Sequence, residues 1–203
     1  MKDPCRNPEL MSSFTFTGTI ACVETSDKTL VLSIEHLAAD RFLTDFKLII
    51  PRASVGTEEF PFMPGEAVMV EDALVYEKDN EVRLRIADMS QIWVTTARPG
   101  EVNALSFSGK IVDIKEETGY NLVYLEQNVY DTFMTRIEVI VSDSVKMEYP
   151  PKVGDIGLIT HALFYEKDGS FRAKLNRKAD YKVLYTPDVV MDMGTIEAKE
   201  LFI

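Results

Sequence analysis

Tyrosine, arginine and lysine side chains alternate with apolar residues along three segments in the second half of the chain. Tyr120 and Tyr124 do so in one segment, Arg136 in the next, and Arg172 and Lys174 in the third. Such alternation is typical of strands that bury one face, so these five side chains are expected together on the exposed face. Tyrosine rings stack on flat groups, and Lys and Arg pair with anions. The residues therefore suggest a binding surface for a ligand that offers both rings and negative charge.

Residue patterns that would support catalysis or a metal site are missing from the sequence. His36 and His161 each stand without a second histidine or a cysteine at metal-ligand spacing. The cysteines form no Cys-x-x-Cys pair; Cys22 ends a strand pattern and is expected in the core, and Cys5 is expected as a free thiol. No Walker lysine loop, Gly-x-Gly-x-x-Gly motif or nucleophile elbow occurs. We therefore predict that the chain is not an enzyme and holds no metal or cofactor.

The composition allows a packed core and gives no sign of a membrane segment. The sequence has 203 residues, of which 46% are hydrophobic and 27% are charged. No apolar run approaches the roughly 20 residues of a membrane span, and the N-terminus lacks the apolar core of a secretory signal. We predict no membrane partner. Because the two cysteines suit a reducing compartment, we also predict a cytoplasmic location.

The net charge of −11 is unevenly distributed along the chain. Residues 1–98 carry a net charge of −6, residues 99–186 carry −2, and residues 187–203 carry −3. A chain this acidic is not expected to bind polyanions over its whole surface. The second half is close to neutral, and it therefore has room for a basic stripe.

One stretch of sequence occurs twice and indicates an internal duplication. Residues 73–85 and 162–174 both contain Ala-Leu, then Tyr-Glu-Lys-Asp, then basic residues that alternate with apolar ones. Upstream, the match continues at an offset of 91, as between Phe16 and Phe107. A register held over this length indicates a duplicated domain. We predict a flexible leader over residues 1–12, a first domain over 13–96, a linker over 97–102, a second domain over 103–186 and an acidic C-terminal tail over 187–203.

Each copy is predicted to form five strands. The first runs over 14–23 or 105–114, the second over 29–35 or 120–126, and the third over 42–50 or 133–141; the repeated hairpin supplies the fourth and fifth, and 91–95 or 181–185 extends the sheet. The alternation slips by one residue after Ile20 and Ile111, which predicts a β-bulge in the first strand. The hairpin turns carry Asn80 and Gly169, residue types that accept a positive φ.

These features resemble the OB-fold of bacterial-type single-stranded-DNA-binding proteins. The resemblance rests on the strand order, the glycine in the first strand (Gly18 or Gly109) and the basic hairpin, and it covers about four-fifths of the chain. It predicts an all-β fold of two tandem five-stranded OB-fold barrels. It also implies a homodimer, because the tandem form of that family dimerises to assemble four barrels. The family has a helix between strands three and four, but prolines such as Pro51 and Pro150 limit any helix here to a turn or two.

The resemblance implies that single-stranded DNA binds over strands two and three, where rings stack on bases and cations follow the phosphates. In the second copy the candidate residues are Tyr120, Tyr124, Arg136, Tyr165, Lys167, Arg172, Lys174, Arg177 and Lys178, and in the first copy they are Lys47, Tyr76, Arg83 and Arg85. The first copy has Ser33 and Asp45 where the second has Tyr124 and Arg136. We therefore predict that the second copy carries most of the affinity and that the first mainly supports assembly.

Plain structural roles fit several of these residues equally well. Exposed Tyr and Arg side chains on a sheet often form cross-strand pairs. Tyr76 and Tyr165 recur beside the hairpin, where bracing the fold is an alternative to binding. Trp93 is expected in core or interface packing, and Phe42 and Phe133 are expected in the core.

The acidic tail ends in an apolar tip of Leu201, Phe202 and Ile203. In the family, a tail of this kind docks on replication and repair proteins, so the resemblance implies such partners; a frayed end or a short packed helix is the alternative. The predicted function is non-catalytic binding of single-stranded DNA, with little sequence preference, in replication, recombination or repair. The alternative function is a protein-interaction or assembly module built on the same barrels.

Overall fold

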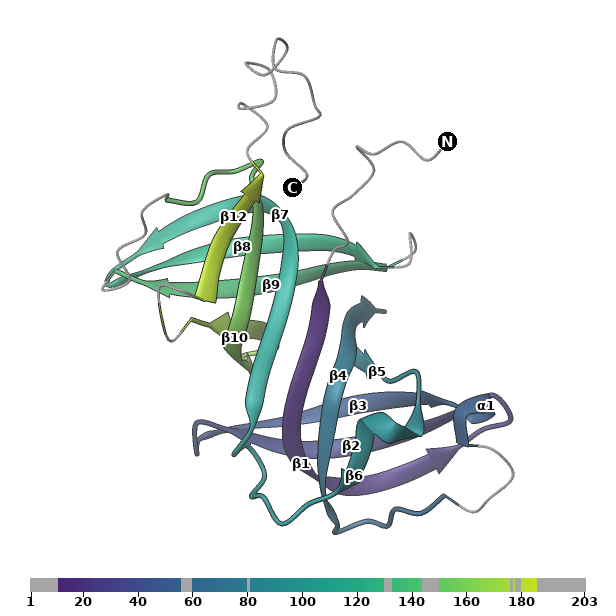
Figure 1. Cartoon of the computed structure of the whole chain (residues 1–203). Helices are drawn as coiled ribbons and strands as arrows, with labels where there is room; N and C mark the ends of the chain where they lie inside the picture. The colour runs from purple at the N-terminus through teal and green to yellow at the C-terminus, as the bar shows by residue number, and fades with distance from the viewer. Residues whose placement is uncertain are drawn as a thin grey trace, which may run out of the picture.

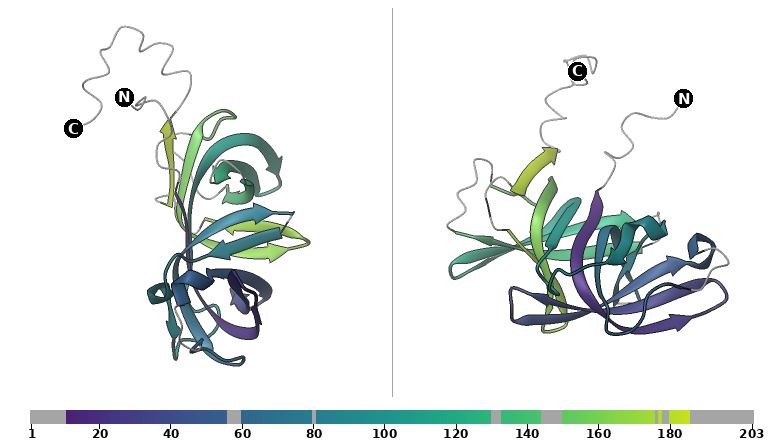
Figure 2. Two further views of the ribbon diagram at one scale, coloured as in Figure 1. Left: turned by 90° about the vertical axis from the view of Figure 1, so that its right-hand side faces the viewer. Right: turned by 60° about the horizontal axis from the view of Figure 1, so that its bottom comes forward.

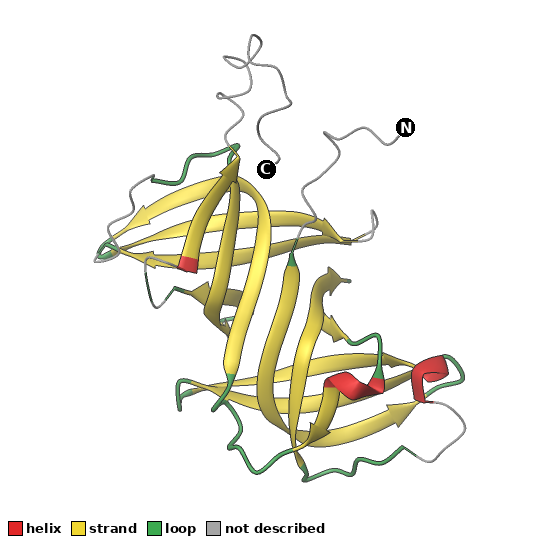
Figure 3. Cartoon of the chain, in the orientation of Figure 1, coloured by secondary structure: helices red, strands yellow, loops and turns green. Residues whose placement is uncertain are grey.

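The computed structural model describes residues 11–55, 60–79, 81–129, 133–143, 150–175, 177 and 180–185. Strands dominate these residues (Figure 1, Figure 3). In chain order they are β1 (Ser12–Thr25), β2 (Thr29–Ala38), β3 (Phe42–Pro51), β4 (Ala67–Lys78), β5 (Glu81–Arg85), β6 (Ile92–Val94), β7 (Asn103–Glu117), β8 (Tyr120–Val129), β9 (Phe133–Ser142), β10 (Ile156–Lys167), β11 (Ser170–Lys174) and β12 (Tyr181–Tyr185). The predicted strands are confirmed, including the two trailing segments.

The two halves of the chain pair their strands in the same way. In the first half β1 pairs with β2, β2 with β3, β3 with β5, β5 with β4, and β4 again with β1. In the second half β7, β8, β9, β11 and β10 repeat this closed series. Only the β3–β5 and β9–β11 pairs are parallel among these. The strands β6 and β12 add to β4 and β10 at the outer edges of the sheet.

The first strand of each half is bulged and curled, as the slip in alternation predicted. The register shifts between Ile20 and Cys22 in β1, and between Ile111 and Asp113 in β7. Just before the second bulge, a Cβ added to Gly109 would lie only 2.6 Å from the carbonyl oxygen of Glu126. Neighbouring strands approach too closely there for any side chain, which explains the glycine in this strand.

Short connections link the remaining strands. The turn between β10 and β11 has positive φ at Asp168 (55°) and Gly169 (76°), the pattern of a type I′ hairpin turn. Between β3 and β4 lies α1 (Arg52–Val55), a single helical turn, as the prolines predicted. A 3₁₀ turn, η1 (Met89–Gln91), precedes β6. In the part of the chain that the structure describes, no helix has the length and apolar character needed to cross a membrane.

The two halves meet along their first strands, which the sequence did not reveal. The strands β1 and β7 pair antiparallel, and Phe14 lies opposite Leu105, its equivalent at the offset of 91. Equivalent residues that pair with each other place a local two-fold axis between the halves. Figure 2 shows the halves from two further sides; one sheet runs through both.

Aromatic pairs brace this junction on both sides of the local axis. The ring of Phe42 stacks on that of Tyr165 with centroids 4.4 Å apart, and the ring of Phe133 lies 5.3 Å from that of Tyr76. Both phenylalanines are only half-buried, so the prediction that they belong to the core is wrong. Each ends up packing on the other half because β3 and β9 begin at the junction.

Two further residues are more exposed than a core position would be, and for Cys22 the burial prediction is wrong. Cys22 is exposed, because it directly follows the bulge in β1, where the strand turns its side chains the other way. Trp93 is 38% exposed, because it lies on the three-residue edge strand β6, which has a neighbour only on the β4 side. This excludes core packing for Trp93, and the alternative of interface packing stays a prediction.

A buried histidine network also joins the halves. The Nδ1 atom of His36 lies 2.8 Å from the carbonyl oxygen of Thr17, which can only accept, so Nδ1 carries the proton. The Nε2 atom then accepts a hydrogen bond from the amide of Asn103, 2.6 Å away. The same amide group of Asn103 donates to the carbonyl oxygen of Phe164 and accepts from its backbone N–H. The neutral imidazole therefore satisfies every partner in the network.

This network predicts a pH dependence of stability. Burial lowers the pKa of His36 below its ordinary value of 6.5, against a smaller upward effect of the hydrogen bond to Thr17. Below pH 6.5 the unfolded chain therefore binds a proton at His36 that the folded chain does not. We expect the contribution of His36 to the free energy of unfolding to be constant above about pH 7 and to fall by up to about 1.4 kcal/mol per pH unit below 6.5.

Urea unfolding between about pH 5 and pH 8 measures this effect. The control is His36→Gln, which copies Gln127, the equivalent residue of the second half. The difference between the two stability curves isolates His36 from carboxylates that titrate in both proteins. If that difference stays constant with pH, the tautomer and the burial assigned to His36 are wrong.

Candidate nucleic-acid interface

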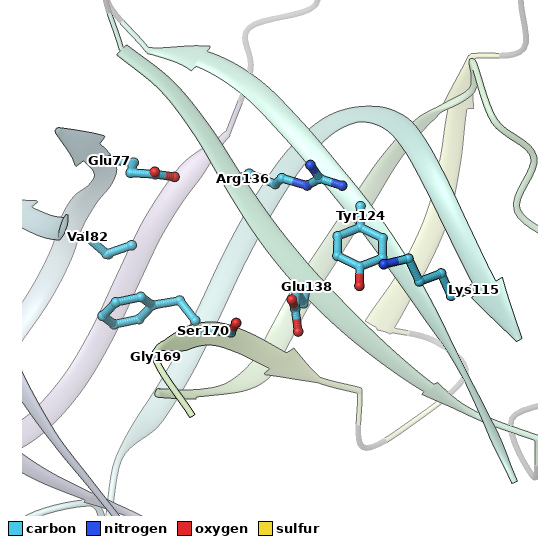
Figure 4. Close-up of a pocket in the computed structure, with 9 residues that line it drawn as sticks. Glu77, Val82, Lys115, Tyr124, Arg136, Glu138, Gly169 and Ser170 are labelled. Carbon is cyan, nitrogen blue, oxygen red and sulfur yellow. The ribbon is translucent and has the colours of Figure 1, made fainter. Parts of the chain in front are cut away.

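A groove of about 340 Å³ crosses the junction between the halves (Figure 4). Its lining residues are Glu77, Val82, Lys115, Tyr124, Arg136, Glu138, Gly169, Ser170 and Phe171. The strands β4 and β5 of the first half supply Glu77 and Val82, and the second half supplies the rest. The groove therefore brings part of the predicted surface of the second half together with the hairpin of the first.

Tyr124 holds two cations at this groove. The Nζ atom of Lys115 lies 4.9 Å from the centroid of the Tyr124 ring, and the Cζ atom of Arg136 lies 4.5 Å from it. Tyr124 points away from the core, because its neighbours Val123 and Leu125 are the fully buried residues of β8. The ring is nevertheless only 6% exposed, so the prediction of an exposed Tyr124 is wrong. Cation–π attraction, worth about 0.5–1 kcal/mol at such sites, lays the two long side chains over the ring.

The predicted arginines of the second half form ion pairs with carboxylates on neighbouring strands. Arg172 donates to Glu138 at 2.9 Å, and Arg136 lies 3.8 Å from Glu126. In both cases the two residues are direct partners across adjacent strands. Cross-strand pairing, the plain alternative for these residues, is therefore present. It leaves the guanidinium groups at the surface with part of their charge already balanced.

Tyr165 and Tyr76 do not offer free rings. Both are buried, Tyr165 under Phe42 and Tyr76 beside Phe133, and burial raises the pKa of the Tyr165 hydroxyl. Their assignment as stacking residues is wrong in this structure, because the junction of the halves covers them. The ring that stays accessible is Tyr120, which is 36% exposed at the start of β8.

The remaining candidates of the second half lie around the hairpin and beyond it. Lys167 and Lys174 are exposed at the ends of β10 and β11. Arg177 is mostly exposed and lies 3.1 Å from the buried carboxylate of Asp180. Lys178 lies outside the described residues, as does the apolar tip of Leu201, Phe202 and Ile203.

On the corresponding face of the first half, Lys47 and Arg83 share one carboxylate. Lys47 lies 3.0 Å from Glu81, and Arg83 lies 3.3 Å from the same carboxylate. The hydrogen bond and the charge of Lys47 lower the pKa of Glu81. Arg85 is exposed at the end of β5. Where the second half has Lys115, Tyr124 and Arg136, this half has Glu24, Ser33 and Asp45, so it lacks the cations over a tyrosine ring.

No protein-family model and no curated protein matches the chain in sequence. Solved structures do match it. The wild-type single-stranded DNA binding protein from Thermus aquaticus aligns with a TM-score of 0.59 and 13% sequence identity over 88% of this chain and 95% of that chain. A deletion mutant of the same protein aligns with a TM-score of 0.58 and 14% identity over 87% and 96%. This likeness supports an OB-fold like that of single-stranded-DNA-binding proteins. At such identity it is a likeness of fold alone.

Sequence reasoning missed most of the groove lining, of which only Tyr124 and Arg136 were candidate residues. Lys115 lies one residue past the predicted end of the first strand, and the alternation after the bulge, continued by one residue, would have found it. Glu77 and Phe171 were read only as parts of the hairpin repeat. Their meeting with Tyr124 depends on how the halves pack. Among the described residues no cluster of His, Cys, Asp and Glu side chains could hold a metal ion.

Proposed function

We propose that each closed series of strands is a five-stranded OB-fold barrel and that the chain binds single-stranded DNA, without catalysis, on the outer face of β8 and β9. The domain limits follow the repeat, with barrels over 13–96 and 103–186. The closed pairing of both halves supports the barrels. The likeness to a single-stranded DNA binding protein of Thermus aquaticus supports the ligand class.

The observation that carries the proposal is the pair of cations held over Tyr124 beside an open groove. Lys115 comes from β7 and Arg136 from β9, and contact with the ring of Tyr124 on the strand between them holds both cations beside the groove, where phosphates of a strand can meet them. Tyr120, four residues earlier on the same face of β8, offers the exposed ring on which a base stacks. Stacking and phosphate pairing together tolerate any base, which suits binding with little sequence preference.

A fluorescence-anisotropy titration with oligo-dT at two salt concentrations tests this function. We expect a dissociation constant in the micromolar range or tighter that weakens with salt. The salt dependence is expected to be shallow, because Arg136 and Arg172 already have carboxylate partners. Absence of binding at low salt would refute the proposal.

Tyr124→Ala is expected to weaken binding of oligo-dT by about fivefold or more. Without the ring, Lys115 and Arg136 lose the contacts that hold them over the groove, and each such cation–π contact is worth about 0.5–1 kcal/mol. Ser33→Ala, the equivalent change in the first half, is the matched control and is expected to leave the affinity unchanged. Equal losses from both variants would end the idea that the second half dominates.

The ion pairs favour a second candidate function, a protein-interaction or assembly module. Four arginines of the predicted surface each have a carboxylate within 4 Å, namely Arg83, Arg136, Arg172 and Arg177. The chain as a whole also carries a net charge of −11. A module of this kind would form a stable oligomer in light scattering and bind no oligonucleotide at low salt. On the leading proposal, light scattering instead finds a homodimer that binds DNA.

The cellular role follows from the same proposal. A cytoplasmic homodimer that covers single-stranded DNA would act in replication, recombination or repair. The tail tip of Leu201, Phe202 and Ile203 would then dock on proteins of those processes. Deletion of residues 187–203 should abolish capture of such proteins while oligo-dT binding remains.

A further inference from the structure

We propose that the groove between the halves holds one nucleobase and selects bases that carry an exocyclic amino group, with Glu77 as the selecting residue. This inference rests on the proposed function, because it assumes that a single strand lies over β8 and β9. It adds a preference at one base position to contacts that otherwise tolerate any sequence.

Glu77 is held in place by the other half of the molecule. Its backbone N–H donates to the hydroxyl of Thr135 on β9 at 3.0 Å. Thr135 directly precedes Arg136, so this bond fixes Glu77 beside the cations of the second half. In Figure 4 the Glu77 carboxylate lies on one side of the groove, with Arg136 and Tyr124 on the other. The packing of the halves therefore fixes the backbone of Glu77 at the edge of the groove.

Glu77 is the carboxylate of the groove that is available to a ligand. The other carboxylate in the lining, Glu138, is bound to Arg172 at 2.9 Å. Among the described residues Glu77 forms no ion pair, and it is half-buried. A carboxylate in this state gains most from a ligand that supplies hydrogen-bond donors.

The rest of the groove suits a flat ring with a phosphate beside it. Val82 and Phe171 give it apolar walls, and its volume of about 340 Å³ lies within the usual range for small-molecule sites. Lys115 and Arg136, on the side opposite Glu77, can hold the adjoining phosphate. A base bound in this way turns its polar edge away from the cations and toward Glu77.

The acceptor-only character of a carboxylate sets the preference. An ionised Glu accepts hydrogen bonds and donates none. Cytosine offers an amino group at N4, adenine one at N6 and guanine one at N2, whereas the one donor of thymine, N3–H, lies between two carbonyl oxygens that a carboxylate repels. Glu77 should therefore favour cytosine over thymine, the two bases of equal ring size.

The test compares oligo-dC with oligo-dT of the same length, by anisotropy at about pH 8, where cytosine stays unprotonated. We expect the wild-type chain to bind oligo-dC at least about fivefold more tightly, the factor that corresponds to the low end of base discrimination. Glu77→Gln should bring the ratio of the two affinities close to one, because the Gln amide can donate to thymine as well as accept from cytosine. The ratio is the readout, since loss of a negative charge raises the affinity for both oligonucleotides.

Glu166→Gln is the matched control. Glu166 is the equivalent residue of the second half, and its backbone N–H donates to Thr44 at 3.0 Å just as that of Glu77 does to Thr135. Glu166→Gln should keep the wild-type ratio. Equal binding of both oligonucleotides by the wild-type chain, or an unchanged ratio in Glu77→Gln, would overturn the inference and leave the proposed function standing. Failure to bind either oligonucleotide would overturn the proposed function and this inference with it.

Discussion

Asn103→Ala is expected to lower the free energy of unfolding by about 3–5 kcal/mol. The Asn103 side chain donates to the carbonyl oxygen of Phe164 at 2.8 Å, accepts from its N–H at 2.7 Å, and meets Nε2 of His36 at 2.6 Å. Alanine leaves all three groups without these partners. Each buried polar group that loses its partner costs about 1–3 kcal/mol, and the lower part of that range applies because Asn103 itself is half-buried and water can reach it.

The first copy of the repeat suggests a variant, Asn103→Ser, that separates the contribution of the Phe164 contacts from that of the His36 contact. Ser12 is the residue equivalent to Asn103, and its hydroxyl bonds both backbone groups of Val75 as Asn103 bonds those of Phe164. Asn103→Ser should therefore keep contacts to Phe164 and lose only the one to His36, at about half the cost of alanine. Urea unfolding of the wild type and both variants measures this order. A loss of less than about 1 kcal/mol for Asn103→Ala would show that the network contributes little to stability.

The local part of the architecture could be predicted because strands, bulges and turns leave a signal in neighbouring residues. Alternation with a period of two placed the strands, and its slip after Ile20 and Ile111 placed both bulges. The same alternation put Tyr120, Arg136 and Lys174 on the exposed face, where they lie. Periodicity reports which way a side chain points, and for these residues nothing else covers that face.

What could not be predicted depends on contacts between residues far apart in the sequence. Tyr124 points outward as its alternation requires, but Lys115 and Arg136 from neighbouring strands cover it. Phe42 and Tyr165 bury each other across the junction of the halves. That junction rests on the pairing of β1 with β7, and alternation along a strand says nothing about which partner its edge will find. The groove exists only because of that pairing. The pattern of residues along one strand therefore could not predict that residues of both halves line it.

Gly100→Ala is expected to destabilise the chain by about 2–5 kcal/mol and to loosen the junction of the halves. Gly100 has a φ of 84°, a conformation that costs alanine about 1–2 kcal/mol. A Cβ on it would lie 1.8 Å from the carbonyl oxygen of Leu37, so the linker or β2 must shift, which adds about 1–3 kcal/mol. The shift matters for the junction because Gly100 and Val102 are bonded to the backbone of Thr17.

Gly65→Ala separates the two causes, because Gly65 also has a positive φ (92°) but an added Cβ would meet nothing within 4 Å. It should cost only the backbone strain of about 1–2 kcal/mol, so thermal unfolding should rank the wild type above Gly65→Ala and Gly65→Ala above Gly100→Ala. Amide hydrogen exchange at Thr17 and Val102 should rise in Gly100→Ala and stay unchanged in Gly65→Ala. If both variants lose the same stability, the close contact with Leu37 is not what fixes the linker. The groove between the halves would then need another explanation for its defined shape, because this linker is the covalent connection that sets how β7 follows β6.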